Sequence, residues 1–316
     1  MVYDISFHPL DIRLAQERVI PFLAGHGRDG DIDDLVADAV RQAKVRFRAN
    51  AWGIGIHYAT TNPYLVHAHY GRPFYVTSPD PSVVAETVVR YTCSSVDDVD
   101  DLARSQLALL DPALLSRVEP DMSGTLPNDE RLAGGFRWKL DLLRAAAAAL
   151  RTGRDTIVRP DGEKASPAGL LARNTIFVLV EFLTALLPGW IERGTMWPTK
   201  LAEQATIDSS VPMTHNTALL GSLVSEFPSL DWETNWTITT NYSVGGYAPP
   251  TQVATLRNWL SGNAEQLTTV GHRWDNHPYV RTALRKMDEA LALAELTGTG
   301  FVEATDIYVP MQGIIN

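Results

Sequence analysis

Two segments with the alternating pattern of β-strands lie near opposite ends of this 316-residue chain, and mainly helical sequence separates them. The first covers residues 2–7, and Pro9 is expected to end it. The second covers residues 300–309 (GFVEATDIYV) and stops before Pro310. An isolated strand leaves its backbone N–H and C=O groups unpaired. We therefore predict that the two segments join one small mixed or antiparallel sheet, and that the chain has an α+β fold.

Between these strands, apolar residues recur at the three- and four-residue spacing of amphipathic helices. We predict helices over residues 11–20, 32–47, 81–91, 96–110, 132–150, 177–187, 199–205, 217–226, 250–262 and 278–296. Because both ends of the chain contribute to the sheet, a single intertwined domain over 1–316 is expected. If the domain is divided, the loop-like residues 119–129 separate an α/β part (1–118) from a mainly helical part that includes the closing strand (130–316).

Residues 53–78 (GIGIHYATTNPYLVHAHYGRPFYVTS) combine three of the eight histidines with five aromatic residues. We predict two or three short strands here, broken at the Asn62-Pro63 pair and again at residues 71–73. If residues 65–70 are extended, His67 and His69 point to the same face because side chains repeat every two residues along a strand. The stretch is therefore the first place to look for a functional site.

Two imidazoles on one face are two of the three or more ligands that a transition-metal site needs. His67 and His69 would supply them, and His57 is expected on a neighbouring strand. Asp275 and His277, in a predicted loop before the last helix, are candidate further ligands. The spacing matches no established zinc motif, and a histidine in an ordinary sheet commonly bonds a backbone carbonyl. A divalent transition metal is therefore the alternative, and no cofactor is the first expectation.

Candidate binding residues lie elsewhere. Arg72, beside a glycine, either binds an anion or pairs with a carboxylate, and pairing is favoured. Residues 232–247 (WETNWTITTNYSVGGY) are rich in aromatic side chains, which are frequent at recognition surfaces but also fill protein interiors. We predict an extended conformation for residues 237–247, with a turn at the two glycines. The candidates in this segment are Trp236, Tyr242 and Tyr247.

The final strand carries two acidic side chains, Glu303 and Asp306. Alternation along a strand places them on opposite faces, so one of them is expected to point inward. A buried carboxylate must find a hydrogen-bond partner.

Charge and cysteine content limit the function further. A formal net charge of −10 argues against nonspecific binding to nucleic acid or to an anionic membrane, since both require a surplus of basic residues. The single cysteine, Cys93, allows no intrachain disulfide. The sequence starts with no basic and apolar secretory pattern, and the apolar residues 175–187 are shorter than a membrane span, so we expect a soluble cytoplasmic protein.

Two functional hypotheses follow. The first is a binding or regulatory protein that recognises a macromolecular partner, a protein rather than nucleic acid. One version of it, suggested by the acidity of the chain and by its lack of a catalytic motif, is a bacterial immunity or conflict-system protein. The alternative is a metal-dependent hydrolase that uses the His67-x-His69 pair.

Metal content separates these hypotheses. The hydrolase requires a stoichiometric transition metal in protein purified without chelator, and the His67→Ala/His69→Ala double variant must lose it. Elemental analysis of the two proteins measures both quantities. Protein that carries no transition metal contradicts the hydrolase, whereas the binding protein requires none.

Overall fold

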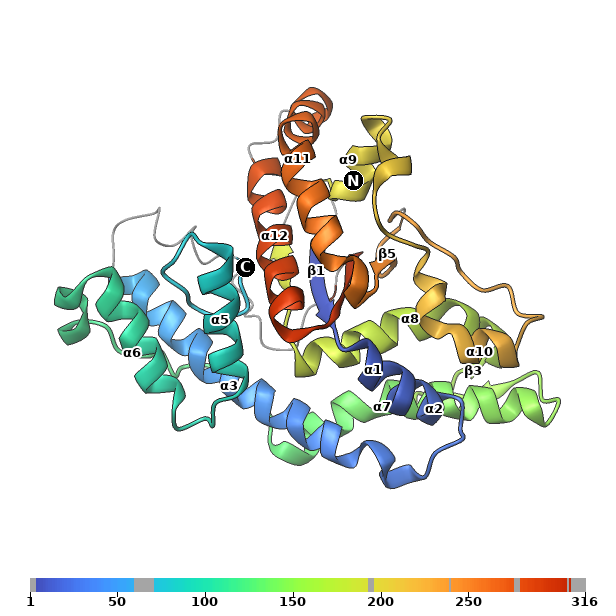
Figure 1. Cartoon of the computed structure of the whole chain (residues 1–316). Helices are drawn as coiled ribbons and strands as arrows, with labels where there is room; N and C mark the ends of the chain where they lie inside the picture. The colour runs from blue at the N-terminus through green and yellow to red at the C-terminus, as the bar shows by residue number, and fades with distance from the viewer. Residues whose placement is uncertain are drawn as a thin grey trace.

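A four-stranded antiparallel sheet lies at the centre of the protein (Figure 1). The structure is a computed structural model, and it describes residues 4–59, 71–192, 196–238, 240–275, 279–305 and 307, with the backbone only at 274 and 275. The order of the strands is β4 (Trp190–Glu192), β1 (Ile5–Leu10), β6 (Gly300–Thr305) and β5 (Val244–Ala248). Helices make up most of the remaining described chain, which confirms the predicted α+β class.

The predicted pairing of the first and last strands is confirmed. In the antiparallel β1–β6 ladder, Ile5 lies opposite Thr305 and Leu10 opposite Gly300. Pro9 was expected to end β1, but the strand continues through it to Leu10. The pairing of β4 with β1 stops at Phe7, so Pro9 lies beyond this ladder, where a proline is tolerated.

The two faces of this sheet belong to separate hydrophobic cores, because alternate residues of each strand point in opposite directions. Ile5, Phe7 and Phe301 pack on one face against α5 (Pro81–Thr92), α11 (Pro250–Asp275) and α12 (Val280–Thr297). Leu10 and Val302 pack on the other against α2 (Ile20–Leu23), α7 (Asp129–Arg151) and α8 (Pro167–Leu186). Every residue of β1, β5 and β6 is buried, as expected for a sheet covered on both faces.

The other described elements are two longer helices and several short helices and strands. They are α1 (Ile12–Leu14), α3 (Asp33–Ala59), α6 (Val99–Leu110), α9 (Pro198–Gln204), α10 (Gly221–Glu226) and a hairpin of β2 (Ile157–Val158) and β3 (Lys164–Ala165). Short π and 3-10 turns cover Ala15–Val19, Asp29–Ile32, Pro112–Ser116, Asp208–Ser210 and Asn216–Leu220.

The first part of the histidine-rich stretch is helical, which corrects the prediction of strands from residue 53. The helix α3 continues to Ala59, because Trp52 and Ile56 extend the apolar face of the preceding turns into the core. Gly55 lies inside this helix, where a Cβ atom would overlap the carbonyl oxygen of Glu119. The glycine therefore permits a close approach of the loop after α6 instead of marking a turn. Residues 60–70 lie outside the described part of the chain.

A second correction concerns Gly245 and Gly246, which were expected to form a turn. Both lie inside β5, at a β-bulge where the register shifts between Val244 and Tyr247. A Cβ atom on Gly246 would lie 2.9 Å from the carbonyl oxygen of Trp236. The glycines thus allow the preceding segment to lie directly over the strand.

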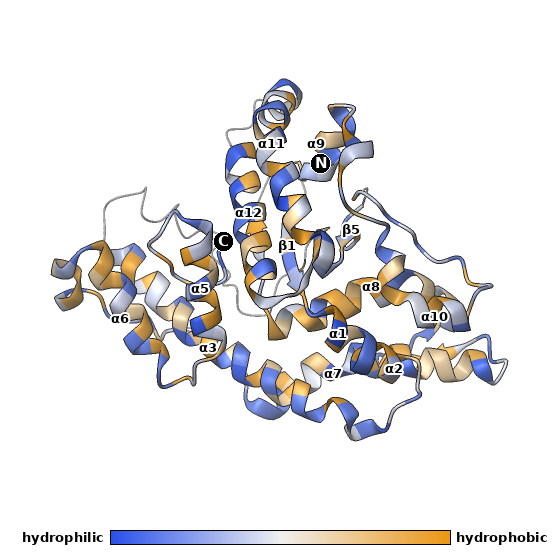
Figure 2. Cartoon of the chain, viewed as in Figure 1, coloured by the Kyte–Doolittle hydropathy of each residue, from blue (hydrophilic) through white to orange (hydrophobic). Residues whose placement is uncertain are grey.

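Among the described helices, only α8 is long and apolar enough to cross a membrane by length and composition. Of its apolar window, 61% is buried inside the protein, as in the core helix of a soluble protein. Figure 2 shows the apolar residues along α8 next to those of α7. The carboxyl end of α8 is bound by the buried guanidinium of Arg46, which donates to the carbonyls of Thr184 (3.3 Å) and Ala185 (2.8 Å). Burial lowers the pKa of Arg46 to about 9.

His8 lies in the middle of β1 on the α8 side of the sheet and is fully buried. Neither ring nitrogen has a hydrogen-bond partner in the described part of the chain. Burial lowers the pKa of His8 to about 3, so the ring is neutral at neutral pH. The backbone of Gly189, between α8 and β4, packs against this ring so closely that a Cβ atom would overlap Nδ1 of His8 and the carbonyl oxygen of Phe7.

We therefore expect Gly189→Ala to destabilise the protein. The free energy of unfolding should fall by about 2–3 kcal/mol, since both overlapping groups belong to a packed central strand. Gly134→Ala in α7 is the matched control, because no heavy atom lies within 4 Å of its added Cβ; it should gain up to about 1 kcal/mol from helix propensity. Urea denaturation followed by circular dichroism measures both values. Equal stability of the two variants would contradict the packing seen at Gly189.

Candidate functional site

The proposed metal ligands fall almost entirely outside the described structure. This is the case for His67, His69, His277 and the side chain of Asp275. His57, which was expected on a neighbouring strand, is exposed on helix α3. In the described part of the chain, no three His, Cys, Asp or Glu side chains are grouped as metal ligands. The metal site stays a prediction.

Arg72 pairs with a carboxylate, as the favoured interpretation of the sequence predicted. Its guanidinium binds Glu289 of α12 through two bonds, Nε to Oε2 at 2.9 Å and Nη2 to Oε1 at 2.5 Å. The side chains of Arg72 and Glu289 are 4% and 0% exposed. A third bond runs from Nη1 to the carbonyl of Val76 at 3.1 Å. Arg72 is therefore committed to an internal contact and does not line a surface site.

Further buried polar groups surround this pair. The indole N–H of Trp190 in β4 donates to Oε2 of Glu289 at 2.9 Å. Lys286, one turn before Glu289, forms an ion pair with Glu192 at 2.8 Å and donates to the carbonyl of Ile191 at 2.8 Å. Burial lowers the pKa of Lys286, and the charge of Glu192 opposes that shift. We call Arg72, Trp190, Glu192, Lys286 and Glu289 the Glu289 cluster.

Gly71 brings the loop before Arg72 into this cluster. Its backbone has φ of 76°, a conformation that side chains other than glycine rarely adopt. The N–H of Ile191 donates to its carbonyl at 2.8 Å. A Cβ atom at this position would overlap the Ile191 carbonyl oxygen and the amine of Lys286. The glycine thus allows three segments, from the loop, β4 and α12, to share one buried polar site.

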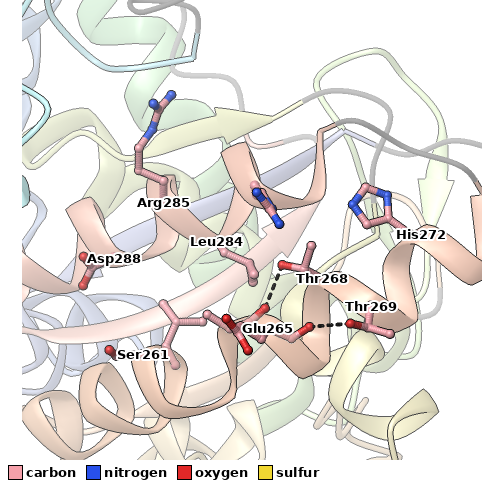
Figure 3. Close-up of a pocket in the computed structure, with 11 residues that line it drawn as sticks. Ser261, Glu265, Thr268, Thr269, His272, Leu284, Arg285 and Asp288 are labelled. Atoms are coloured by element: carbon pink, nitrogen blue, oxygen red, sulfur yellow. Dashed lines mark hydrogen bonds between the residues drawn. The ribbon is translucent and has the colours of Figure 1, made fainter.

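The outer side of α12 faces a groove. With α11 it encloses about 650 Å³, and we call this space the α11–α12 groove (Figure 3). The lining residues from α11 are Leu260, Ser261, Ala264, Glu265, Thr268, Thr269 and His272, and those from α12 are Arg281, Leu284, Arg285 and Asp288.

The floor of the groove is apolar and its rim is polar. Leu260 and Leu284 are buried, and Leu284 points across the groove toward Thr268 (Figure 3). The exposed rim consists of Ser261, Glu265, Thr269, His272, Arg281 and Arg285. A concave surface with an apolar base and a few polar groups is typical of ligand-binding sites.

The charges of the rim are only partly compensated. Asp288 shares Arg257 with Glu295, and the Nε of Arg257 lies 2.7 Å from the carboxylate of Asp288. Arg285 lies 3.8 Å from Glu289, which Arg72 already binds through two bonds. Arg281 forms no ion pair with any residue in the described part of the chain. Positive charge is therefore available at the α12 side of the groove.

The two threonine hydroxyl groups on the α11 side donate hydrogen bonds to their own helix. Thr268 donates to the carbonyl of Ala264 at 2.7 Å, and Thr269 donates to that of Glu265 at 2.8 Å. With their protons used in this way, both oxygens have acceptor capacity for a ligand N–H group.

Sequence analysis missed this groove because it ended the helix of α11 at Gly262. The helix continues to Asp275, so His272 belongs to its last turns and not to a loop. Gly262 is exposed and no heavy atom lies within 4 Å of a Cβ placed there, so it costs only about 1 kcal/mol of helix propensity. The apolar positions Leu256, Leu260 and Leu267 continue through the glycine at helical spacing, and this was the signal that could have revealed the longer helix.

The aromatic side chains of residues 232–247 range from buried to exposed. Tyr247 is 7% exposed in β5, and Trp236 packs partly buried against the core. Tyr242 differs, because 68% of its surface is exposed and its backbone has φ of 56°. Its ring meets the edge of Phe177 at a centroid distance of 6.0 Å. Of the three predicted aromatic contacts, only Tyr242 is available at the surface.

Glu303 is the inward-facing carboxylate expected in the last strand, and Asp306 lies outside the described residues. Glu303 is fully buried and accepts hydrogen bonds from the hydroxyl of Thr199 at 2.5 Å and from its backbone N–H at 3.3 Å. Burial raises the pKa of Glu303 to about 7, and the two bonds from Thr199 oppose that shift. The contact holds the first turn of α9 against the sheet.

No family model, curated protein or solved structure matches this chain. Its function must therefore be inferred from the geometry and charge of the described residues. Of the sites above, only the α11–α12 groove is both concave and open to a ligand.

Glu303 gives a testable pH dependence of stability. Its carboxyl has a pKa of 4.5 as an unperturbed group and about 7 when folded. Because folding raises this pKa, the contribution of Glu303 is fully present below pH 4.5, falls between pH 4.5 and 7, and is constant above that. We expect Glu303→Gln to be more stable than the wild type by about 3 kcal/mol at pH 8 and equal to it near pH 4.5.

Urea unfolding of both proteins across this pH range measures the difference. Glu163→Gln, in the exposed turn between β2 and β3, is the control and should give the wild-type profile. A constant difference between Glu303→Gln and the wild type over the whole range would show that Glu303 does not titrate there.

Proposed function

We propose that this protein is a binding protein that recognises another macromolecule, and that the α11–α12 groove receives a segment of the partner. The observation that carries the proposal is the groove itself, with its apolar floor, its polar rim and its volume of about 650 Å³. This volume is within the range of about 300–1,000 Å³ found for ligand sites.

The shape of the groove favours a polypeptide segment. Its lining residues extend along α11 from Leu260 to His272, a length of about 18 Å at 1.5 Å per residue. An extended peptide of about five or six residues has this length. Small molecules are usually enclosed over most of their surface, whereas more than half of the residues that line this groove are exposed.

Both walls of the groove are held in place without a ligand. The Glu289 cluster fixes α12 against β4 and the loop at Arg72. The two helices meet closely at Gly271, where a Cβ atom would lie 2.6 Å from a methyl group of Val280. A wall that is already ordered reduces the entropy lost on binding.

A random hexapeptide library displayed against the immobilised protein tests the proposal. We expect enriched peptides to bind the wild type in solution, measured by fluorescence polarisation. Ser261→Trp places a large side chain in the groove from an exposed position and should weaken binding by at least about tenfold, or about 1.4 kcal/mol.

The matched control is Gln266→Trp, an exposed position on the same helix that does not line the groove. Its affinity should stay within about twofold of the wild type. The proposal fails if no peptide is enriched, or if Ser261→Trp binds the enriched peptides as tightly as Gln266→Trp does.

A further inference from the structure

We infer that the segment bound in the α11–α12 groove is acidic, with an aspartate or glutamate side chain next to an apolar residue. The inference rests on the proposed function and adds the chemistry of the partner. It follows from the rim charges, from the hydroxyl acceptors and from the apolar floor.

The groove lining carries two arginines and two carboxylates, and its positive charge is concentrated on the α12 wall, whereas the whole chain has a net charge of −10. Arg281 has no ion-pair partner in the described part of the chain. Arg285 shares Glu289 with Arg72, which holds both oxygens of that carboxylate at 2.5 and 2.9 Å. The guanidinium groups of Arg281 and Arg285 are therefore available to a carboxylate from outside, which an arginine binds through two parallel hydrogen bonds.

The lining also carries two carboxylates, those of Asp288 and Glu265. Asp288 is held by Arg257, which also binds Glu295 at 2.6 Å. Glu265 is the other acidic lining residue and lies on α11, whereas both lining arginines lie on α12. The imidazole of His272 lies at the far end of the groove from Ser261 and Asp288 (Figure 3).

The remaining groups distinguish a peptide from a small free anion. The oxygens of Thr268 and Thr269 have acceptor capacity, and a peptide backbone supplies N–H donors for them, whereas a carboxylate ion such as acetate supplies no donor at neutral pH. Leu260 and Leu284 offer an apolar surface next to these groups, which favours a hydrophobic side chain beside the acidic one.

Three synthetic hexapeptide pools test the inference. In each pool positions 2 and 4 are fixed as Glu, Gln or Lys, position 3 is Leu, and the other positions are random. We expect the Glu pool to bind the wild-type protein at least about tenfold more tightly than the other two, measured by competition in fluorescence polarisation. Its affinity should fall as salt rises, since the contact is a solvent-exposed ion pair.

Single-arginine variants then test whether the preference for acidic peptides arises from the groove. Arg281→Gln should weaken the Glu pool by about fivefold or more and leave the Gln pool unchanged, because only a charged ligand uses the guanidinium. Arg131→Gln, at an exposed position on α7, is the matched control and should affect no pool. Circular dichroism of each variant verifies that it is folded.

The outcomes separate the two proposals. If the Gln or Lys pool binds as tightly as the Glu pool and Ser261→Trp abolishes that binding, the groove binds peptides but the acidic preference is wrong. If the Glu pool binds best but Arg281→Gln weakens all pools equally, the preference does not arise from this arginine and the inference is overturned. If no pool shows binding that depends on Ser261, the proposed function and the inference are both wrong.

Discussion

The buried carboxylate of Glu289 is the contact on which the arrangement of this protein depends. It is fully buried, and its two oxygens receive Arg72 from a loop and Trp190 from β4. A buried charge is stable only when its partners are in place, and removal of one partner from such a pair typically costs about 3–5 kcal/mol. Because Glu289 lies on α12, the same contact that joins the loop to the sheet also fixes the helix whose outer side forms the groove.

The central sheet connects the Glu289 contact to the two ends of the chain and to the helices on its faces. Its first and last strands, β1 and β6, pair over six residues, so the two ends of the sequence cannot separate without breaking the ladder. Helices α11 and α12 pack on one face, and α8 packs on the other. Arg46 of α3 binds the end of α8 just before the chain turns into β4. Polar contacts thus hold β4 on two sides, through Arg46 at the end of the preceding helix and through the Glu289 cluster.

The parts of the fold that follow from local pattern were predictable, and those that depend on close tertiary approach were not. Alternation and the need to pair a lone strand were sufficient to predict the β1–β6 contact. Gly55 was placed in a strand segment, Gly245 in a turn and Gly262 at a helix end, yet Gly55 and Gly262 lie within helices and Gly245 within a strand. Two of them meet other parts of the chain, and the third faces solvent. Arg72 and Glu289 are separated by 217 positions, and no spacing rule connects them.

The proposed acidic segment would meet the arginines of the α12 wall on a chain whose net charge is −10. At a distance beyond the Debye length of about 8 Å, ionic screening suppresses the net charge, so an acidic segment can approach. In the proposed complex, Arg281 and Arg285 at the rim of the groove would act over short range. A polyanion such as nucleic acid would also meet the acidic surface outside the groove and would be repelled there. A short segment with one or two carboxylates next to apolar side chains meets the arginines without that repulsion, so charge and shape together favour a protein partner over a nucleic acid.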